Sequence, residues 1–578
     1  MLLSNLNLLA TAPGGVAKLR ELILTLAVQG KLVPQDPKDE PASELLKKIR
    51  AEKDRLIAEG KIRRDKPLAE IAEEEKPFEL PQGWEWVRLV DVAFPQAGFA
   101  FKSNGFNEAS QGLPLIRIRD VGDNDPQTFF SGDYREEFAV ESGDWLISMD
   151  GEFRVREWLG PKALLNQRVT RLVFHGEDVF QPFVTAALQF KLSELQGTKA
   201  YTTVDHLSGG QIAASVIALP PLTEQSRIVT RVEELMRLCD VLEAKGQLEA
   251  TQHAQLVSTL LGTLTESETP EELADNWQRV ATHFDLLLDR PEAVDALEQT
   301  ILQLAVRGLL VPQDPEDEPA SELLKKIRAE KDGLIAEGKI KRDRPLAEIS
   351  SDERPFEAPI GWGWVRLGDV VLISSGVTLG RKTAIPSPVS LPYVRVANVQ
   401  RWHLNLSSMK EVVIDNSEIE RFKLAGGDLL ITEGGDWDKV GRTSIWRNEL
   451  LTCLHQNHVF KARGTSTDWN PVWAELFLNS SIARTYFASS AKQTTNLASI
   501  NMTQLKDCVF PIPPLSEQSR IVARVAHLRR MSTELRQRLT AANERQSQLA
   551  QSLVAVQPMT IVSTVPMSTF DSTKCIKR

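Results

Sequence analysis

The stretch VPQDPKDEPASELLKKIRAEKDRLIAEGKIRRDKPLAEI runs from Val33 to Ile71, and the stretch VPQDPEDEPASELLKKIRAEKDGLIAEGKIKRDRPLAEI runs from Val311 to Ile349. The two copies lie 278 positions apart and differ at four of 39 residues. Near-identity of this kind within one chain predicts that the same structural unit is built twice. The sequence on either side of the two copies then decides the architecture.

The repeat extends well beyond this segment. At the same offset of 278, Leu8–Gly30 matches Leu286–Gly308, and the peptide GWEWVRLVDV matches GWGWVRLGDV. A second pair, LPPLTEQSRIVTRVEELM (Leu219–Met236) and IPPLSEQSRIVARVAHLR (Ile512–Arg529), matches at an offset of 293. The stretches between these blocks resemble each other only faintly. The chain is therefore interpreted as a repeated frame that alternates with two divergent inserts.

Length and composition indicate a multidomain globular protein. A chain of 578 residues is too long for one core, and 42% hydrophobic and 25% charged residues are ordinary values for globular chains. No apolar run reaches membrane-spanning length, and no basic region precedes the apolar residues at the start, so we expect neither a membrane span nor a signal peptide. The four cysteines lie far apart, which predicts no disulfide framework and no zinc site. We expect a cytoplasmic protein.

A heptad pattern follows each PPL[TS]EQ motif. Thr223 and Ser516 are expected N-caps, and the glutamate that follows each suits the positive end of a helix dipole. Apolar or small residues then recur in steps of four and three, which predicts a long seam of the coiled-coil type. The seam comprises Ile521, Val525, Leu528, Ser532, Leu535, Leu539, Ala542, Gln546, Leu549 and Leu553 in the second copy. The first copy has Ile228, Val232, Leu235, Cys239, Leu242, Leu256 and Leu260. The two seams are natural partners for each other, although each could instead pack on its own domain.

The rest of the frame predicts shorter helices. One opens at Pro41, or at Pro319 in the second copy, and ends at Gly60 or Gly338. Its charged face, KKIRAEKDR, is most simply a solvated surface, because interleaved acidic residues cancel much of the field that a nucleic acid would need. Another helix ends at Gly30, and its copy ends at Gly308.

The order of the blocks suggests a closed arrangement. The central heptad helix continues into the second frame copy, whereas the C-terminal heptad helix ends in a polar tail. The frame segment that would follow the C-terminal helix stands instead at the N-terminus, as residues 8 to 71. If the termini lie near each other, the chain forms two units related by a pseudo-twofold axis.

These motifs resemble the specificity subunit of type I DNA restriction-modification enzymes. The resemblance rests on LPPLTEQSRIVTRVEEL and IPPLSEQSRIVARVAHL, on LAVQGKL and LAVRGLL at the helix ends, and on the GDWLIS and GDLLIT strands of the inserts. It implies an α+β fold with two mixed α/β target recognition domains, separated by long antiparallel coiled-coil helices in a pseudo-twofold internal repeat. The chain departs from the family plan in its long N-terminal frame extension, which looks like a circular rearrangement.

The resemblance also implies domains and a role. The expected domains are an N-terminal frame repeat (1–82), a first recognition domain (83–222), a central helical spacer and frame repeat (223–360), a second recognition domain (361–515), a C-terminal coiled-coil helix (516–556) and a flexible tail (557–578). Each recognition domain would read one half of a bipartite site in double-stranded DNA, and the helices would set the spacer and dock two methyltransferase subunits. Restriction/motor subunits would complete the complex.

Catalysis is expected to lie on the partner subunits. We find no Asn-Pro-Pro-aromatic or Asp-Pro-Pro-Tyr tetrapeptide, and GVTLGRKT fails the spacing of a phosphate loop. The chain itself is predicted to be non-catalytic and to bind no cofactor or metal. In the family, S-adenosylmethionine, ATP and Mg belong to the partners. A specificity chain of another restriction-system class, or a stand-alone DNA-binding regulator, is the alternative.

Residue chemistry in the inserts points to DNA contacts. The peptide LPLIRIRDV alternates as a strand, with Ile116 and Ile118 facing a core and both arginines on the other face. LPYVRVANV repeats the pattern. Arginine pairs with guanine and asparagine with adenine by bidentate hydrogen bonds, although solvated surface arginines have the same appearance. Glycine-rich turns with basic residues allow backbone to approach phosphate, and further polar clusters follow. The predicted DNA-binding residues are Lys102, Arg117, Arg119, Arg154, Arg156, Gln167, Arg168, Thr202, Thr203, His206, Arg395, Asn398, Lys439, Arg442, Gln456, Asn457, His458, Thr494, Thr495 and Asn496.

Charge is unequal between the inserts. Residues 88–218 hold 12 Lys/Arg against 17 Asp/Glu, a net charge of -5, whereas residues 366–511 hold 16 against 13, a net charge of +3. With a net charge of -10 for the whole chain, a generic nucleic-acid binder is not expected. Because phosphate contacts dominate affinity for DNA, the acidic first insert predicts that partner subunits help to hold the duplex.

Overall fold

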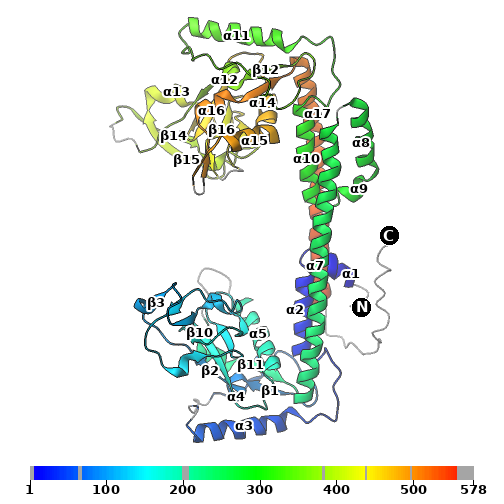
Figure 1. Ribbon diagram of the computed structural model, residues 1–578, viewed down its shortest axis with the longest axis vertical. Helices are drawn as coiled ribbons and strands as arrows, with labels where there is room; N and C mark the ends of the chain where they lie inside the picture. The colour runs from blue at the N-terminus through cyan, green and yellow to red at the C-terminus, as the bar shows by residue number, and fades with distance from the viewer. Residues whose placement is uncertain are drawn as a thin grey trace. The chain divides into compact units, whose positions relative to one another are not determined.

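The computed structural model describes residues 6–60, 62, 68–197, 207–267, 269–380, 385–435, 439–494 and 497–555. The chain divides into two compact units. Unit 1 comprises Met1–Leu248 with Asn543–Arg578, and unit 2 comprises Glu249–Ala542. The chain passes between them twice, once inside helix α7 (Leu222–Glu266) and once inside helix α17 (Leu515–Ala555), which therefore run in opposite senses between the units (Figure 1).

Unit 1 consists of frame helices and the first insert. The frame helices are α1 (Leu6–Thr11), α2 (Gly15–Val28) and α3 (Ala42–Ala58). A neck of two antiparallel strands, β1 (Glu85–Arg88) and β11 (Val216–Leu219), carries the insert. Within the insert a four-stranded sheet has the order β2 (Ala93–Ala97), β10 (Val169–Phe174), β7 (Trp145–Ser148), β8 (Val155–Glu157). A five-stranded sheet has the order β3 (Phe106–Asn107), β5 (Phe129–Phe130), β4 (Leu113–Ile116), β9 (Ala163–Leu165), β6 (Ala139–Val140). The insert helices are α4 (Leu89–Val92), α5 (Gln181–Gly197) and α6 (Gly209–Ala214).

Unit 2 repeats this plan with additions. Its frame helices are α8 (Pro270–Thr282), α9 (Phe284–Leu287), α10 (Pro291–Val306) and α11 (Ala320–Ala336). The neck pairs β12 (Gly363–Arg366) with β23 (Val509–Ile512). The four-stranded sheet has the order β13 (Val371–Ser374), β20 (Val459–Gly464), β16 (Leu429–Thr432), β18 (Thr443–Ile445). Two three-stranded sheets follow, β15 (Lys410–Asp415), β14 (Pro388–Val394), β19 (Leu454–His455) and β17 (Gly434–Gly435), β22 (Leu497–Ser499), β21 (Lys492–Thr494). The insert helices are α12 (Leu367–Val370), α13 (Ile419–Phe422), α14 (Pro471–Leu478), α15 (Ser481–Ser490) and α16 (Met502–Asp507).

The two inserts share an α+β fold despite their faint sequence similarity. In both four-stranded sheets the longest strand, β10 or β20, is second in the order. It pairs with the strand that follows the GD motif, which is β7 in the first insert and β16 in the second. Both necks have the same antiparallel pairing, so each insert leaves and rejoins its frame at one place. The shared strand order confirms the internal repeat.

A buried arginine in each neck forms hydrogen bonds with both the frame and the insert. Arg88 is 8% exposed and forms two hydrogen bonds with the Glu75 carboxylate, at 3.0 and 2.9 Å. Arg366 is 6% exposed and binds Glu353 in the same way, at 2.8 and 2.9 Å. Each guanidinium also donates to a carbonyl oxygen of the insert. The neck arginines therefore join frame to insert by charge-assisted hydrogen bonds.

The repeated segment binds the start of each long helix. Glu224 is 1% exposed, and its carboxylate accepts hydrogen bonds from Trp84 Nε1 at 3.0 Å and from Gln35 Nε2 at 3.3 Å. Asp39 accepts from the Thr223 hydroxyl at 2.5 Å and pairs with Arg227 at 2.6 Å. Burial raises the pKa of Glu224, and the Arg227 guanidinium lowers the pKa of Asp39.

The second copy makes the equivalent contacts. Glu517 accepts from Trp362 Nε1 at 2.9 Å and from Gln313 Nε2 at 2.7 Å, and Asp317 pairs with Arg520 at 2.6 Å. The expectation that Thr223 and Ser516 are N-caps was wrong, because the helices begin one residue earlier, at Leu222 and Leu515. Glu224 and Glu517 therefore accept hydrogen bonds from the repeated segment in a buried contact, in addition to lying near the positive end of the helix dipole. Because both copies make the same contacts with a long helix, they need the same residues at these positions.

Replacing Glu224 by alanine should destabilise unit 1. The variant leaves Trp84 Nε1 without its acceptor in a buried site, which costs about 1–3 kcal/mol. Chemical denaturation of the full chain measures the loss, and Glu517→Ala should cost a similar amount. Glu233→Ala is the matched control, because Glu233 lies on the exposed surface of the same helix. Equal stability of Glu224→Ala and Glu233→Ala would contradict the role of the junction.

The long helices follow the predicted seam at first and then leave it. Ile228 and Ile521 are 1% and 0% exposed, and each belongs to a cluster that includes residues of the neighbouring insert. Farther along, the expected seam residue Leu256 is 52% exposed, and Val257 is buried instead. Likewise Leu549 is 55% exposed, and Ala550 is buried. A strict heptad drifts by about 20° per seven residues on a straight α-helix, so the buried stripe moves to the next position.

A third helix takes part in the packing of unit 2. The cluster that contains Val257 and Leu261 of α7 also contains Leu297 of α10 and Val525 of α17. Residues of both long helices and of a frame helix therefore belong to one hydrophobic cluster in unit 2.

The N-terminal helices and the end of α17 lie together in unit 1. Leu9 and Ala12 form a small cluster with Ala550, and Leu19 packs against it. This confirms that the first and last helices of the described chain are close in space. No helix in the described part of the chain is both long and apolar enough to cross a membrane.

Candidate nucleic-acid interface

Two parallel strands end side by side in the first insert. Strand β4 pairs with β9 in the register Leu115↔Leu164 and Ile116↔Leu165. The carboxyl ends of these strands therefore lie at one edge, where Arg117 follows β4 and the turn Asn166–Arg168 follows β9. Gln167 and Arg168 are exposed. Three predicted contact residues, Arg117, Gln167 and Arg168, are thus brought to the same edge.

The second insert builds the same edge. Strand β14 pairs with β19 in the register Tyr393↔Leu454 and Val394↔His455, and the Gln456 amide donates to the Val394 carbonyl at 2.9 Å. Arg395 therefore stands beside the turn Gln456–His458. Of these four residues His458 is the most open to solvent, and the others are partly buried. The tip of this turn presents amide and imidazole groups where the first insert presents an arginine.

A hairpin loop adjoins each turn. In the first insert the Ser148 hydroxyl donates to the Glu152 carbonyl at 2.6 Å and accepts from the Arg154 amide at 2.9 Å. In the second, the Thr432 hydroxyl donates to the Lys439 carbonyl at 2.8 Å and accepts from the Arg442 amide at 3.0 Å. Arg154 and Arg442 therefore occupy equivalent positions after loops of different length.

Backbone hydrogen bonds and acidic side chains join turn to loop. The Met149 amide donates to the Arg168 carbonyl at 3.1 Å, and Arg168 Nε lies 3.5 Å from Asp150 Oδ2. The equivalent bond runs from the Glu433 amide to the His458 carbonyl at 3.0 Å, and His458 Nδ1 lies 2.7 Å from Glu433 Oε2. An acidic residue thus lies beside each candidate contact turn, one position farther along the loop in the first insert than in the second.

These acidic residues were missed by the sequence reasoning. Glu433 directly follows its GD strand and Asp150 follows the other GD strand after Met149, so an acid within two residues of each strand was a usable signal. Gln400 was also missed, and it accepts a hydrogen bond from Arg442 at 2.7 Å. An amide next to an arginine offers both donors and acceptors to a base edge.

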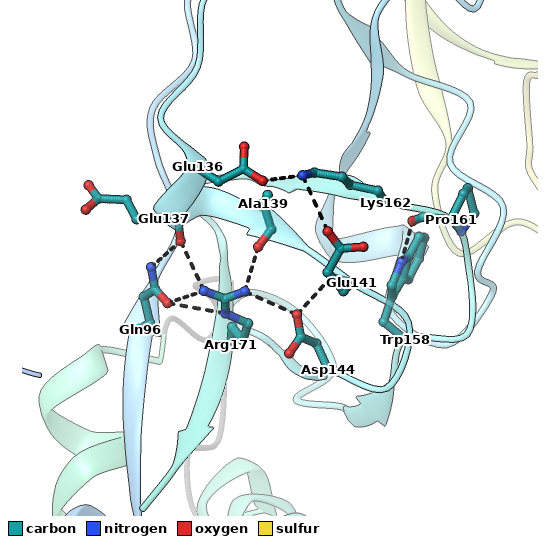
Figure 2. Close-up of polar contacts among 10 residues, drawn as sticks. All are labelled: Gln96, Glu136, Glu137, Ala139, Glu141, Asp144, Trp158, Pro161, Lys162 and Arg171. Atoms are coloured by element: carbon teal, nitrogen blue, oxygen red, sulfur yellow. Dashed lines mark hydrogen bonds and ion pairs between the residues drawn. The ribbon is translucent and has the colours of Figure 1, made fainter. Parts of the chain in front are cut away.

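An arginine network holds the strands that carry these loops in the first insert. Arg171, on β10, donates to the Ala139 carbonyl at 2.6 Å, to Asp144 at 3.1 Å, to Gln96 at 2.7 Å and to the Glu137 carbonyl at 3.0 Å (Figure 2). Asp144 is the acid of the GD motif. In the second insert Arg463 binds Asp428 with two hydrogen bonds of 2.6 and 2.7 Å. The GD motif therefore anchors its strand to the neighbouring strand.

The alternating pattern of the two arginine strands was wrong. Strand β4 ends at Ile116, and Ile118–Asp120 forms a 3-10 turn, so Arg117 and Arg119 do not share a strand face. Arg117 lies 5.5 Å from the centroid of Phe106, whereas Arg119 donates to Thr128 at 3.4 Å. Strand β14 likewise ends at Val394, before a 3-10 turn at Val396–Asn398. The capping of each turn by a side chain overrides the strand pattern.

Asn398 does not fit a base-reading role. It is 1% exposed, its Oδ1 accepts from the Arg395 amide at 2.9 Å, and its Nδ2 donates to the Asn405 carbonyl at 2.8 Å. Asp120 caps the equivalent turn of the first insert, accepting from the Arg117 amide at 2.7 Å. The residue three positions after each arginine is thus a cap, because the backbone needs an acceptor there.

The remaining predicted residues are dispersed or undescribed. Lys102 is exposed in the loop that precedes β3, and Arg156 lies on β8, where it donates to Gln189 at 3.1 Å. Lys439 is exposed near the end of the second hairpin loop. The residues that lie outside the described part of the chain are Thr202, Thr203, His206, Thr495 and Asn496, together with the side chain of Thr494.

Buried ionisable groups support the second insert from within. Burial lowers the pKa of His455 to about 4, and its Nδ1 lies 2.8 Å from the Val459 carbonyl. Burial also lowers the pKa of Lys461 to about 8. Among the described residues no group of three His, Cys, Asp or Glu side chains is placed to hold a metal ion.

Known proteins resemble this chain over nearly its whole length. A family profile described as the type I restriction modification DNA specificity domain matches residues 81–252 and 359–544. The chain is 38% identical to the type I restriction enzyme EcoAI specificity subunit of Escherichia coli and 34% identical to the EcoEI specificity subunit of the same species, in each case over 93% of both chains. A chain from a solved structure of a type I R-M system is 20% identical, over 83% of this chain and 98% of that chain, with a TM-score of 0.43.

Proposed function

Because this chain belongs to the type I restriction modification DNA specificity family, we propose that it is the sequence-specific DNA-recognition subunit of a type I restriction-modification complex. The chain is not an enzyme by itself, and the catalytic activities lie on partner subunits. The observation that carries the proposal is the pair of inserts whose four-stranded sheets have the same strand order and whose loops differ. A common scaffold with divergent loops suits two readers of two different sequences.

Each insert reads one half of a bipartite target. We assign the readers to residues 83–222 and 361–515. In the first, Gln167 and Arg168 lie on the turn at the strand edge, with Arg117 beside them and Arg154 on the adjoining hairpin loop. In the second, the equivalent residues are Arg395, Arg442, Gln456, Asn457 and His458. Arginine and amide side chains at the tips of turns suit hydrogen bonding to base edges in the major groove.

Phosphate contacts are assigned to the flanking basic residues. Lys102, Arg119, Arg156 and Lys439 lie outside the two turns, and basic residues outside a base-reading surface can neutralise the charge of the DNA backbone. The first insert carries a net charge of -5, so it depends more than the second on help from other subunits in holding the duplex. Thr202, Thr203 and His206 in the first insert, and Thr494, Thr495 and Asn496 in the second, are further candidate contact residues that rest on the sequence alone.

The subunit works in a complex with modification and restriction subunits. We assign two methyltransferase subunits to it, one for each half of the pseudo-twofold repeat, since a duplicated frame presents the same docking surface twice. S-adenosylmethionine, ATP and Mg belong to these partners. Chromosomal DNA as the substrate places the complex in the cytoplasm.

The purified chain should transfer no methyl group. Incubated with S-adenosylmethionine and DNA that contains its target, it should give incorporation equal to a blank without protein, because the inserts supply side chains for reading and none of the cofactor-binding motifs. Addition of the modification subunits should start the reaction, which is the control for active substrate and DNA. Incorporation by the pure chain that grows with its concentration would contradict the assignment.

Methylome sequencing of the host with and without this gene tests the function itself. We expect one methylated motif, made of two defined blocks around a spacer of undefined bases, to disappear with the gene. Supplying the gene on a plasmid should restore the same motif. A stand-alone DNA-binding regulator would leave the methylome unchanged.

A further inference from the structure

The two frame helices carry the same apolar face. Four apolar residues of this face are identical at equivalent positions in α2 and its copy α10, namely Val16 and Val294, Leu19 and Leu297, Ile23 and Ile301, Leu26 and Leu304, whereas the buried Leu22 corresponds to the buried Thr300. The starts of the long helices α7 and α17 also share their apolar seam residues, apart from Cys239 in place of Ser532. Apolar packing depends on shape and area, so such similar faces discriminate little between the two long helices.

The charges on these helices do differ. In unit 1, Arg20 of α2 lies 2.7 Å from Asp240 and 2.9 Å from Glu243 of α7. In unit 2, Arg536 of α17 lies 2.6 Å from Asp295 and 3.1 Å from Glu298 of α10. Each network joins one arginine to two carboxylates across the contact between a frame helix and a long helix.

The repeat offsets show that the second network is the charge-reversed copy of the first. An offset of 278 puts Glu298 at the position of Arg20, and an offset of 293 puts Arg536 at the position of Glu243. The second carboxylate has no reversed counterpart, because Asp240 corresponds to Thr533 and Asp295 corresponds to Ala17, both uncharged. The arginine therefore stands on the frame helix in unit 1 and on the long helix in unit 2.

Both arginines occupy comparable surroundings. Their side chains are 32% and 31% exposed, and in both the Nε atom is buried without a hydrogen-bond partner among the described residues. The carboxylate of Glu298 is 15% exposed, against 61% for Glu243. Partial burial reduces screening, which makes the sign of a neighbouring charge matter more than it does on an open surface.

Docking each frame helix on the other long helix would bring like charges together. Helix α2 on α17 would place Arg20 against Arg536. Helix α10 on α7 would place Asp295 and Glu298 against Asp240 and Glu243. We propose that these charge-reversed networks form a pairing code, which directs each near-identical frame helix to its own long helix and opposes exchange within the chain or with a second copy of it. Discrimination by an unfavourable alternative is how charged residues specify partners in coiled coils.

A variant that keeps every ion pair but removes the reversal tests this proposal. Asp295→Ala, Glu298→Arg, Thr533→Asp and Arg536→Glu together give unit 2 the charges of unit 1, so native pairs survive and wrong pairs become allowed. Ala17→Asp, Arg20→Glu, Asp240→Thr and Glu243→Arg together make the mirror variant. Glu322→Lys with Lys325→Glu makes the same kind of exchange in an exposed pair within α11 and is the matched control.

The full-length proteins are unfolded in urea and refolded at low salt, and the fraction that returns as the original species is measured by size-exclusion chromatography with light scattering. We expect the urea midpoints of both same-order variants to remain near that of the wild type, while their native yields fall several-fold and exchanged oligomers increase. The exposed-pair control should refold like the wild type. In about 1 M salt, where the Debye length is about 3 Å, the wild-type yield should fall toward that of the variants.

A permuted variant makes the test independent of any one substitution. Arg20→Glu with Glu298→Arg retains the net charge, mismatches both native contacts and matches both wrong ones, so it should give the lowest native yield of all. Wild-type yields from both same-order variants would overturn the proposal. A permuted variant that refolds as faithfully as the same-order variants would overturn it as well.

Discussion

Exchanging residues 367–508 for the corresponding insert of another family member should replace one half of the methylated sequence and leave the other half unchanged. The effect is all-or-none at the exchanged half-site, since a different set of turns would then read the DNA. The insert can be exchanged as one piece because its two ends meet at the neck formed by β12 and β23. The Leu367 amide donates to the Cys508 carbonyl at 2.9 Å, so both junctions lie at neighbouring points of one strand pair. Methylome sequencing of cells that carry the chimera gives both half-sites directly.

The junctions are chosen to keep the frame intact. Arg366 and Glu353 remain, and the pairing of β12 with β23 is preserved, so the new insert meets the contacts that held the old one. The matched control is the reciprocal exchange of residues 89–215, because Leu89 and Ser215 form the equivalent bond at 2.8 Å. It should change only the opposite half-site. A single exchange that altered both half-sites would show that the inserts do not read independently.

Lengthening both long helices by four residues should lengthen the spacer of the target by one or two base pairs. The insertions follow Leu248 in α7 and Ala541 in α17, which are equivalent positions near the points where the chain passes between units. Four helical residues add roughly 6 Å at about 1.5 Å per residue, and one base pair of DNA spans about 3.4 Å. The two half-sites themselves should stay the same, because no residue of either insert changes.

The place of the insertion matters for its interpretation. A position directly after Leu242 and Leu535 would separate the apolar seam from the ion pairs of Glu243 and Arg536, whereas the chosen positions leave both networks whole. An insertion in α7 alone is the control. It shifts one helix against the other by a full turn, and we expect it to abolish methylation. If the doubly lengthened protein methylated sites with the parental spacer, the long helices would not set the distance.

Much of the architecture followed from the sequence because repetition is a strong signal. The offsets of 278 and 293 located the frame and the inserts, and the apolar periodicity located α2, α3 and the two long helices to within a few residues. Local rules sufficed at Gly60 and Gly338, whose positive φ angles of 71° and 72° let the chain leave the helix. The polar clusters that contain Gln167–Arg168 and Gln456–His458 were also picked out from the sequence, and their contact with DNA stays a prediction.

Other features depended on contacts between distant parts of the chain. The pattern at Arg117 and Arg395 looked like a strand, but Asp120 and Asn398 cap a 3-10 turn there, and a short local pattern cannot reveal that a buried cap competes with it. Glu224 looked like an ordinary first-turn acid. Its burial arises because Trp84 and Gln35, far away in sequence, donate hydrogen bonds to it.

By itself the sequence determined that the protein has two inserts in a duplicated frame, since near-identical segments fold alike wherever they stand in a chain. Only the tertiary structure decided which side chains gather at each reading edge, because the pairing of β4 with β9 and of β14 with β19 joins residues that no periodicity relates. The tertiary structure also showed which charged partners Arg20, Glu243, Glu298 and Arg536 have. In the sequence these are ordinary charges on amphipathic helices, and their reversal gains significance only through the pairs of helices that bring opposite charges within 3.1 Å.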